Sequence, residues 1–167
     1  MTPSGSYNHS QKVLKEKAQK AMFPLLSAIS QFNLSPSTAL KLFELYIKPI
    51  ALYNSENWAT LTEHRIDAIS SGKSRVIDYA LESEPDTVVK KCLKFLLGVG
   101  KNTSTVAILG ECGQIPFFIH GLLNVLKFWF RIRSLPENML VSKAYELQLD
   151  GNIQSDWLNI IFFCYVT

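Results

Sequence analysis

The stretch Leu40-Lys-Leu-Phe-Glu-Leu-Tyr-Ile-Lys-Pro-Ile-Ala-Leu-Tyr-Asn-Ser-Glu-Asn-Trp58 carries the strongest packing signal in the chain. On a helix that turns about 100° per residue, its apolar side chains gather on one broad face and its charged side chains on the opposite face. A face this wide and aromatic is expected to be buried against other helices. The apolar face comprises Ala39, Leu42, Phe43, Tyr46, Ile47, Ile50 and Tyr53, and the charged face comprises Lys41, Glu44 and Lys48.

The same stretch has a clear start and an interruption. Ser35 can cap the first free N–H groups of a helix, and Pro36 suits the first helical turn. Pro49 has no N–H group, and its ring collides with the carbonyl of Leu45. The pattern therefore predicts either one kinked helix or two helices that meet at an angle.

Helical spacing recurs along the rest of the chain, and no run of strict two-residue alternation occurs. We therefore predict an all-α fold, an irregular bundle of about seven helices with little or no sheet. The other expected helices cover 11–32 (after a Ser10 cap), 87–97 (closed by Gly98), 104–110, 117–135, 138–149 and 153–165, with a short helix and an acidic loop between 60 and 85. Residues 1–10 are then a flexible lead-in, 11–135 the main helical domain, and 136–167 additional C-terminal helices.

Composition favours a packed globular chain. Of the 167 residues, 47% are hydrophobic and 19% are charged, which argues against general disorder. The apolar segments 115–126 and 157–166 are shorter than the roughly 20 residues that a membrane-spanning helix needs, and we recognise no signal peptide. The cysteines Cys92, Cys112 and Cys164 form no close pair, so we expect buried thiols in an intracellular protein, cytoplasmic or nuclear, without membrane contact.

Charge is divided into blocks along the chain. Residues 1–60 hold six Lys and Arg against three Asp and Glu, and residues 87–135 hold seven against one. Residues 61–86 hold three against six, and residues 136–167 hold one against four. Two basic blocks separated by an acidic block indicate an anion-facing surface, for which nucleic acid is the commonest partner. The alternative is a solvated surface with uneven charge, and composition does not decide between the two.

Four lysines crowd the first half of the first predicted helix. Positive charge near a helix N-terminus opposes the helix dipole, so helix stability does not account for these lysines. Contact with phosphate groups would account for them. They are Lys12, Lys15, Lys17 and Lys20.

A second pair of cations lies near the end of the predicted helix 117–135. Lys127 and Arg131 are four residues apart and share a helix face, with Trp129 and Phe130 nearby. Arginine beside an aromatic ring is typical of nucleic-acid surfaces. A packing role explains the pair equally well, in which the aliphatic part of the Lys or Arg side chain lies over an aromatic ring of the core.

The side-chain pattern specifies no catalytic site. We find no nucleophile with an adjacent base, no paired carboxylates and no metal-ligand cluster at a spacing that defines chemistry. We therefore predict no catalytic residue, no metal and no cofactor within this chain.

Several short stretches resemble, in the same order, reverse transcriptases of non-LTR (LINE-type) retrotransposons. In that family a Lys-Pro-Ile-x-x-Tyr-Gly-x-Glu-x-Trp-Gly segment lies downstream of the polymerase active site, and residues 48–58 resemble it. The other matching stretches are Ser4–Tyr7, Lys94–Val99, Gly110–Pro116 and Phe128–Trp129. The resemblance assigns a structural role to the motif residues Pro49, Tyr53, Glu56, Trp58, Gly98, Gly110, Glu111, Gly113, Pro116 and Trp129.

The resemblance implies the thumb and post-thumb region of an RNA-directed DNA polymerase. The catalytic Tyr-x-Asp-Asp of the family lies upstream of this region, so we expect no polymerase activity from this chain alone. The implied partners are RNA or an RNA–DNA hybrid, bound weakly and non-specifically, and the rest of a polymerase polyprotein. Lys48 joins the four lysines of the first helix as an implied phosphate contact. A thumb without its palm would expose apolar surface, so self-association through that surface is also expected.

The chain departs from the family pattern at Asn54, Asn57, Ala59 and Cys112, which points to a decayed or diverged copy. Asparagine tolerates positive φ, so Asn54 can stand where the family has glycine. Two other interpretations stay open. The chain is either a helical protein–protein interaction module that meets an acidic partner, or the non-functional product of a decayed element.

Overall fold

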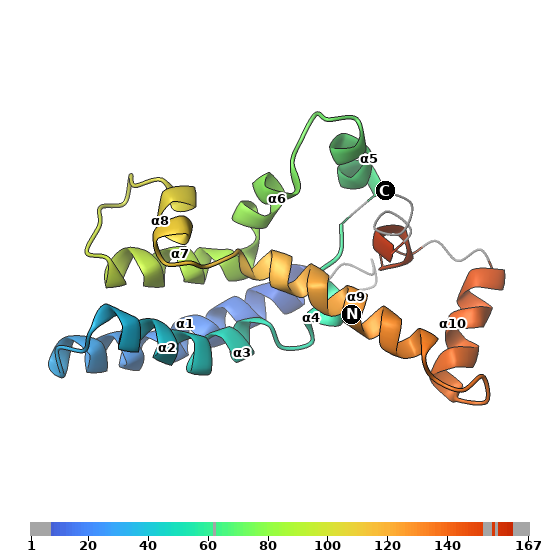
Figure 1. Ribbon diagram of the computed structural model, residues 1–167, viewed down its shortest axis with the longest axis horizontal. Coiled ribbons are helices and arrows are strands. Elements are labelled where there is room, and N and C mark those ends of the chain that lie inside the picture. Colours follow the sequence, from blue (N-terminus) through green and yellow to red (C-terminus); the bar gives the residue numbers. More distant parts are fainter. Residues whose placement is uncertain (1–7, 62, 152–154, 156, 162–167) are drawn as a thin grey trace. The chain divides into compact units, whose positions relative to one another are not determined.

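A computed structural model describes residues 8–61, 63–151, 155 and 157–161 (Figure 1). This part of the chain forms ten helices and no strand, which confirms the all-α prediction. Residues 157–161 are also helical. The ten helices are α1 (Asn8–Gln31), α2 (Pro36–Tyr46), α3 (Lys48–Ala51), α4 (Ser55–Trp58), α5 (Glu63–Ser70), α6 (Val76–Glu82), α7 (Glu84–Leu96), α8 (Thr105–Glu111), α9 (Phe117–Arg133) and α10 (Leu140–Asp150).

Four expectations concern residues that lie wholly or mostly outside the described part. They are the lead-in 1–10, the motif Ser4–Tyr7, the thiol of Cys164 and most of the predicted helix 153–165. The helix count exceeds seven because the opening stretch divides into α2, α3 and α4, and the region 60–85 holds two helices instead of one helix and a loop.

The chain divides into two compact units. Unit 1 comprises Met1–Asn54 and Val76–His120, and unit 2 comprises Ser55–Arg75 and Gly121–Thr167. The units are interleaved along the sequence, and the boundary between them falls within α9. The predicted division at residue 135, between the main helical domain and the additional C-terminal helices, stays a prediction.

The start of α2 and the break after it follow the sequence. The Ser35 hydroxyl accepts a hydrogen bond from the Thr38 amide at 3.3 Å, and Pro36 occupies the first turn. α2 ends at Tyr46 and α3 begins at Lys48, because Pro49 has no N–H group to donate to the carbonyl of Leu45. The structure therefore has two helices rather than one kinked helix. Asn54, with φ of 56°, adopts the left-handed conformation that its residue type allows.

Two starts differ from the prediction. α1 begins at Asn8, so Ser10 lies inside the helix and does not cap it. Nothing in residues 8–10 breaks a helix, so the first turn extends past the predicted cap. α7 begins at Glu84 rather than at residue 87, because the Ser83 hydroxyl caps it and Pro85 fits its first turn. At the other end of α7, Gly98 has φ of +63°, which confirms the predicted glycine cap.

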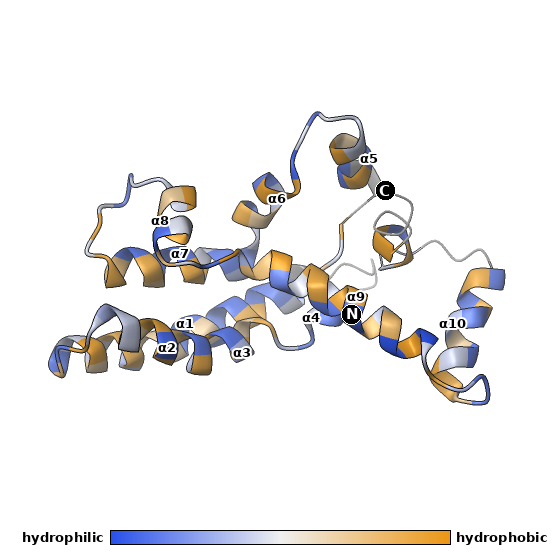
Figure 2. Cartoon of the chain, in the orientation of Figure 1, coloured by the Kyte–Doolittle hydropathy of each residue, from blue (hydrophilic) through white to orange (hydrophobic). Residues whose placement is uncertain are grey.

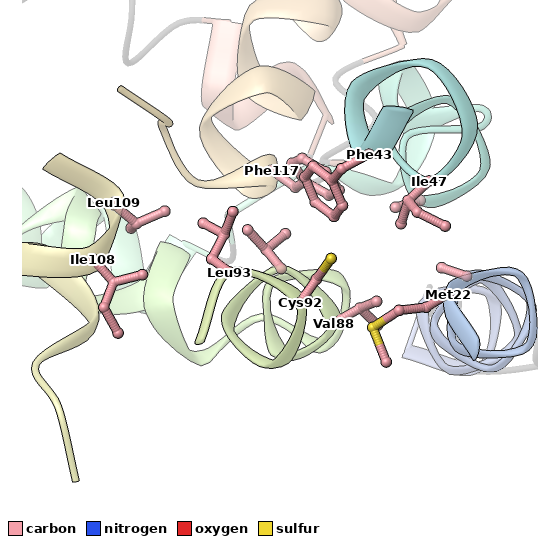
Figure 3. Packing of buried hydrophobic residues seen from close by; sticks show 12 residues of the cluster. Met22, Phe43, Ile47, Val88, Cys92, Leu93, Ile108, Leu109 and Phe117 are labelled. Atoms are coloured by element: carbon pink, nitrogen blue, oxygen red, sulfur yellow. The ribbon is translucent and has the colours of Figure 1, made fainter. Parts of the chain in front are cut away.

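The core of unit 1 is built where α1, α2, α3 and α7 pack together (Figure 1). Figure 3 shows Phe43 and Ile47 facing Met22, Val88 and Cys92. The rings of Phe43 and Phe117 stack with their centroids 5.7 Å apart. Figure 2 shows hydrophobic and hydrophilic residues mixed along α1, α2 and α7, as expected of helices that bury one face.

The buried face of the opening stretch is narrower than predicted. Its fully buried residues, Ala39, Phe43, Ile47 and Ala51, recur at every fourth position. Tyr46 and Tyr53 were predicted on this face, but they are 62% and 72% exposed. A tyrosine at the edge of the buried face can keep its hydroxyl in water, so burial of these two rings in the core is not required.

Unit 2 contains a cluster of aromatic rings around Trp157. The Trp157 ring lies edge to face with Phe128 and Tyr145, at centroid distances of 6.1 and 6.3 Å. Its Nε1–H donates to the carbonyl of Glu56 at 3.0 Å, which ties residues 157–161 to α4. Trp129 Nε1–H donates to the Tyr145 hydroxyl at 3.0 Å and so joins α9 to α10.

Candidate nucleic-acid interface

The four lysines of α1 do not form one group. Lys12, Lys17 and Lys20 are exposed, whereas Lys15 is half-buried and its Nζ lies 2.6 Å from Glu84 Oε2. This ion pair joins α1 to α7, so Lys15 has a structural role within unit 1. Among the described residues, Lys12, Lys17 and Lys20 form no salt bridge.

The three exposed lysines lie away from the buried seam of α1, which includes Ala18 and Met22. Lys12 and Lys20 are eight residues apart and share one face of the helix. Glu16 lies between them and is also exposed, so it reduces the local positive charge without removing it. Lys12, Lys17, Lys20 and Glu16 together carry a net charge of +2. All four side chains are exposed, so an extended anion can reach them.

Lys48 belongs to α3, which packs against α1 and α2 within unit 1. Its side chain is half-buried. The helix that carries Lys48 therefore contacts the helix that carries the exposed lysines.

Lys127 and Arg131 line a pocket of about 210 Å³ in unit 2, together with Glu56, Asn124 and Phe128. The Arg131 guanidinium lies 5.0 Å from the centre of the Phe128 ring, within the range of a cation–π contact. Asn124 Nδ2–H donates to the buried Ser55 hydroxyl at 2.8 Å, which fixes one wall of the pocket. The pocket thus brings the predicted pair Lys127 and Arg131 together with Glu56, a residue of the family motif.

The geometry agrees with both interpretations of the Lys127–Arg131 pair, a nucleic-acid surface and a cation packed over an aromatic ring. Arg131 lies over the half-buried Phe128 ring, as a cation over a packed aromatic ring would. Trp129 is 7% exposed and bonded to Tyr145, so its ring is not available to a nucleotide base. Phe130, at 63% exposed, is the accessible ring of this helix end.

The family-motif residues divide into buried and surface positions. Trp58, Pro116 and Trp129 are buried, and Gly98 and Gly113 have positive φ, where glycine is favoured. Pro49, Tyr53, Gly110 and Glu111 are exposed, and Glu56 is half-buried. Structural roles in packing and turns fit the first five residues, and Pro49 separates α2 from α3. No contact of the described residues explains the identity of Gly110 or Glu111.

The two thiols of the described residues, Cys92 and Cys112, show no sign of activation. Burial raises the pKa of the Cys92 thiol to about 12, and the neighbouring Cys112 adds to the shift. Burial also raises the pKa of the Cys112 thiol, with a further contribution from Glu111. Both thiols are protonated at neutral pH, so neither supplies a thiolate nucleophile. Among the described residues, no three His, Cys, Asp or Glu side chains are grouped so that they could hold a metal ion.

Asp86 is a buried acidic side chain with three hydrogen-bond donors, and it is not among the site residues predicted from the sequence. Its carboxylate is 2% exposed and accepts hydrogen bonds from the amides of Phe117 and Phe118, at 2.7 and 2.9 Å. Ser83 donates to it at 2.5 Å and also caps α7. The Ser83-x-x-Asp86 spacing is a capping-box pattern that could have revealed the cap, but not the link to α9.

None of the described helices combines the length and the apolar character that crossing a membrane requires. Comparisons of the chain with protein-family models, with curated proteins and with solved structures find no match. The described residues form an all-helical fold with exposed basic surfaces, so a function for the chain is proposed from these surfaces and the sequence motifs.

Proposed function

We propose that this chain is a thumb-like segment of a non-LTR retrotransposon reverse transcriptase, which grips template–primer nucleic acid non-specifically and performs no catalysis by itself. The ordered motif stretches support the ancestry. The observation that carries the binding function is the exposure of Lys12, Lys17 and Lys20 without a salt bridge among the described residues. An intracellular location, cytoplasmic or nuclear, and attachment to the rest of a polymerase polyprotein are parts of this proposal.

The spacing of the lysines suits a phosphate backbone. At about 1.5 Å of rise per residue, Lys12 and Lys20 are separated by roughly 12 Å along α1. Successive phosphates of one strand are separated by about 3.4 Å along a duplex axis, so the helix face spans about three nucleotides. Contacts of this kind fix position on the backbone and carry no sequence information.

Removal of the three charges tests the proposed surface. The variant Lys12→Gln/Lys17→Gln/Lys20→Gln is expected to bind an RNA–DNA hybrid about tenfold more weakly at low salt, because up to three phosphate contacts are lost. Fluorescence anisotropy with a labelled hybrid measures the affinity. Lys41→Gln/Lys73→Gln/Arg75→Gln removes the same charge from other exposed positions and is the matched control. An equal loss in both variants would mean that net charge, rather than α1, attracts the nucleic acid.

A second candidate function, self-association, is favoured by α10. Leu140, Ala144 and Leu147 follow one another at four- and three-residue steps, and the two leucines are 83% and 69% exposed. Lys143 and Glu146 flank this stripe on one side. When two such helices pair antiparallel about a two-fold axis, Lys143 of each copy faces Glu146 of the other. We propose that a second copy of the chain covers this stripe.

Charge exchange tests the pairing. Lys143→Glu is expected to weaken dimerisation, because like charges then face each other across the axis, and the double variant Lys143→Glu/Glu146→Lys is expected to restore it. Sedimentation equilibrium over a concentration series measures the monomer–dimer equilibrium. A wild-type chain that stays monomeric, or a double variant that stays as weak as the single one, would contradict this pairing.

A further inference from the structure

A pocket in unit 1 gathers three lysines that the proposed function does not use. The pocket has a volume of about 440 Å³ and lies at the C-terminal end of α7. No carboxylate is among the residues that line it. These residues are Lys91, Lys94, Phe95, Gly98, Val99 and Lys101.

Helical spacing and one glycine create this pocket. Lys91, Lys94, Phe95 and Gly98 recur at steps of three and four residues, so they share one face at the end of α7. The positive φ of Gly98 turns the chain back at that point. The amide of Val99 then donates to the carbonyl of Lys94 at 3.1 Å, in the pattern of a helix C-cap.

A lysine side chain of α7 holds the loop that follows Gly98 against the helix. Lys94 Nζ donates to the backbone carbonyl of Lys101 at 2.5 Å. An ammonium group has three N–H donors, so two donors of Lys94 remain for another acceptor. Lys91 and Lys101 are exposed, and among the described residues neither forms a salt bridge. The partial negative charge at a helix C-terminus explains the presence of one nearby cation. Three cations with no carboxylate among the lining residues form a site that favours an anion.

The fourth side chain of interest is an accessible aromatic ring. Phe95 is 48% exposed and lines the same pocket as the three lysines. An aromatic platform beside cations is the arrangement that holds single-stranded nucleic acid, because the ring stacks on a base while the cations contact phosphates. In a duplex each base is already stacked and paired, so only an unpaired base can use Phe95. The volume lies within the range of about 300–1,000 Å³ that is typical of small-ligand pockets, which suits one nucleotide.

We propose that this pocket binds an unpaired nucleotide of single-stranded nucleic acid, with the base on Phe95 and the adjacent phosphates on Lys91, Lys94 and Lys101. The inference goes beyond the proposed function, because it involves neither α1 nor a hybrid duplex. It also does not depend on the ancestry of the chain.

The test compares two changes at the pocket with changes elsewhere. Lys91→Gln/Lys101→Gln leaves the Lys94 contact to the loop carbonyl in place and is expected to weaken binding of a fluorescent uridine homopolymer about tenfold. Phe95→Ala is expected to weaken it about fivefold or more, and Phe95→Leu, which keeps apolar bulk, by a similar factor. Lys41→Gln/Lys73→Gln, at exposed positions outside the pocket, is the matched control. Anisotropy gives the affinities, and circular dichroism with thermal melting shows that each variant is folded.

Each outcome separates this inference from the proposed function. The α1 triple variant is expected to keep its affinity for the single strand within about twofold, since none of its three lysines lines the pocket. The pocket variants are expected to keep their affinity for the hybrid within the same factor. Single-strand binding that is equally strong in wild type, Phe95→Ala and Phe95→Leu would overturn the proposal. Equal weakening by the pocket and control lysine pairs, or equally strong competition by polyglutamate, would overturn it as well.

Discussion

Replacement of Asp86 by alanine is expected to lower the free energy of unfolding by about 3 kcal/mol or more. The change leaves the amides of Phe117 and Phe118 without their acceptor at the start of α9, where Phe117 is fully buried. A buried donor without a partner costs about 1–3 kcal/mol, and two are created here. Chemical denaturation of wild type and variant measures the difference.

Asp86→Asn separates the role of shape from the role of charge. An amide has one acceptor oxygen, so one of the two amides of α9 loses its partner, and we expect a loss of about 1–3 kcal/mol. A variant Asp86→Ala as stable as wild type would contradict the role assigned to this carboxylate.

The pH dependence of the stability of wild type and Asp86→Asn gives a second test of the role of Asp86. Burial raises the pKa of Asp86 above its ordinary value, and the hydrogen bonds from Ser83, Phe118 and Phe117, with the charge of Lys90, oppose the shift. The folded state therefore holds this proton at a pH where the unfolded state has released it. The stability of wild type relative to Asp86→Asn is expected to be greatest below the unfolded pKa and to fall as pH rises through the folded pKa.

The second large effect is expected at Gly121. A Cβ atom at this position of α9 would lie 2.4 Å from Cβ of Ala59, which is far inside van der Waals contact. Gly121→Ala is expected to destabilise the protein by about 2 kcal/mol, because overpacking outweighs the gain of roughly 1 kcal/mol in helix propensity. Thermal or chemical unfolding measures the change.

Two further variants isolate the cause. Ala59→Gly removes the opposing methyl group, so the double variant Gly121→Ala/Ala59→Gly is expected to recover most of the loss. A Cβ atom added at Gly110 in α8 would meet no atom of another element within 4 Å, so Gly110→Ala is expected to be neutral or slightly stabilising. A Gly121→Ala variant that is as stable as Gly110→Ala would contradict the close approach.

Local signals in the sequence predicted local features of the fold. The Ser35 cap, the break at Pro49 and the left-handed Gly98 depend on neighbours within a few residues, and all three are confirmed. The predicted burial of Tyr46 and Tyr53 is wrong. Helical periodicity gives the direction in which a side chain points, but not how much of the helix face the neighbouring helices cover.

The candidate site could be predicted only in part, because its decisive contacts join distant residues. Lys15 pairs with Glu84 across 69 positions, and nothing in the lysine pattern distinguishes it from Lys17 or Lys20. Asp86 reaches amides that lie 31 and 32 residues further on. The pocket at the end of α7 depends on a chain reversal that brings Lys101 back to the helix.

The affinity for an RNA–DNA hybrid as a function of salt concentration tests the central claim most directly. If the three exposed lysines of α1 each neutralise one phosphate, the logarithm of the association constant falls linearly with the logarithm of salt concentration, with a slope of about −3 or steeper. The α1 triple variant should show a slope that is smaller in magnitude by up to about three. An absent signal at low ionic strength, or an affinity that does not change with salt, would contradict the proposed binding surface.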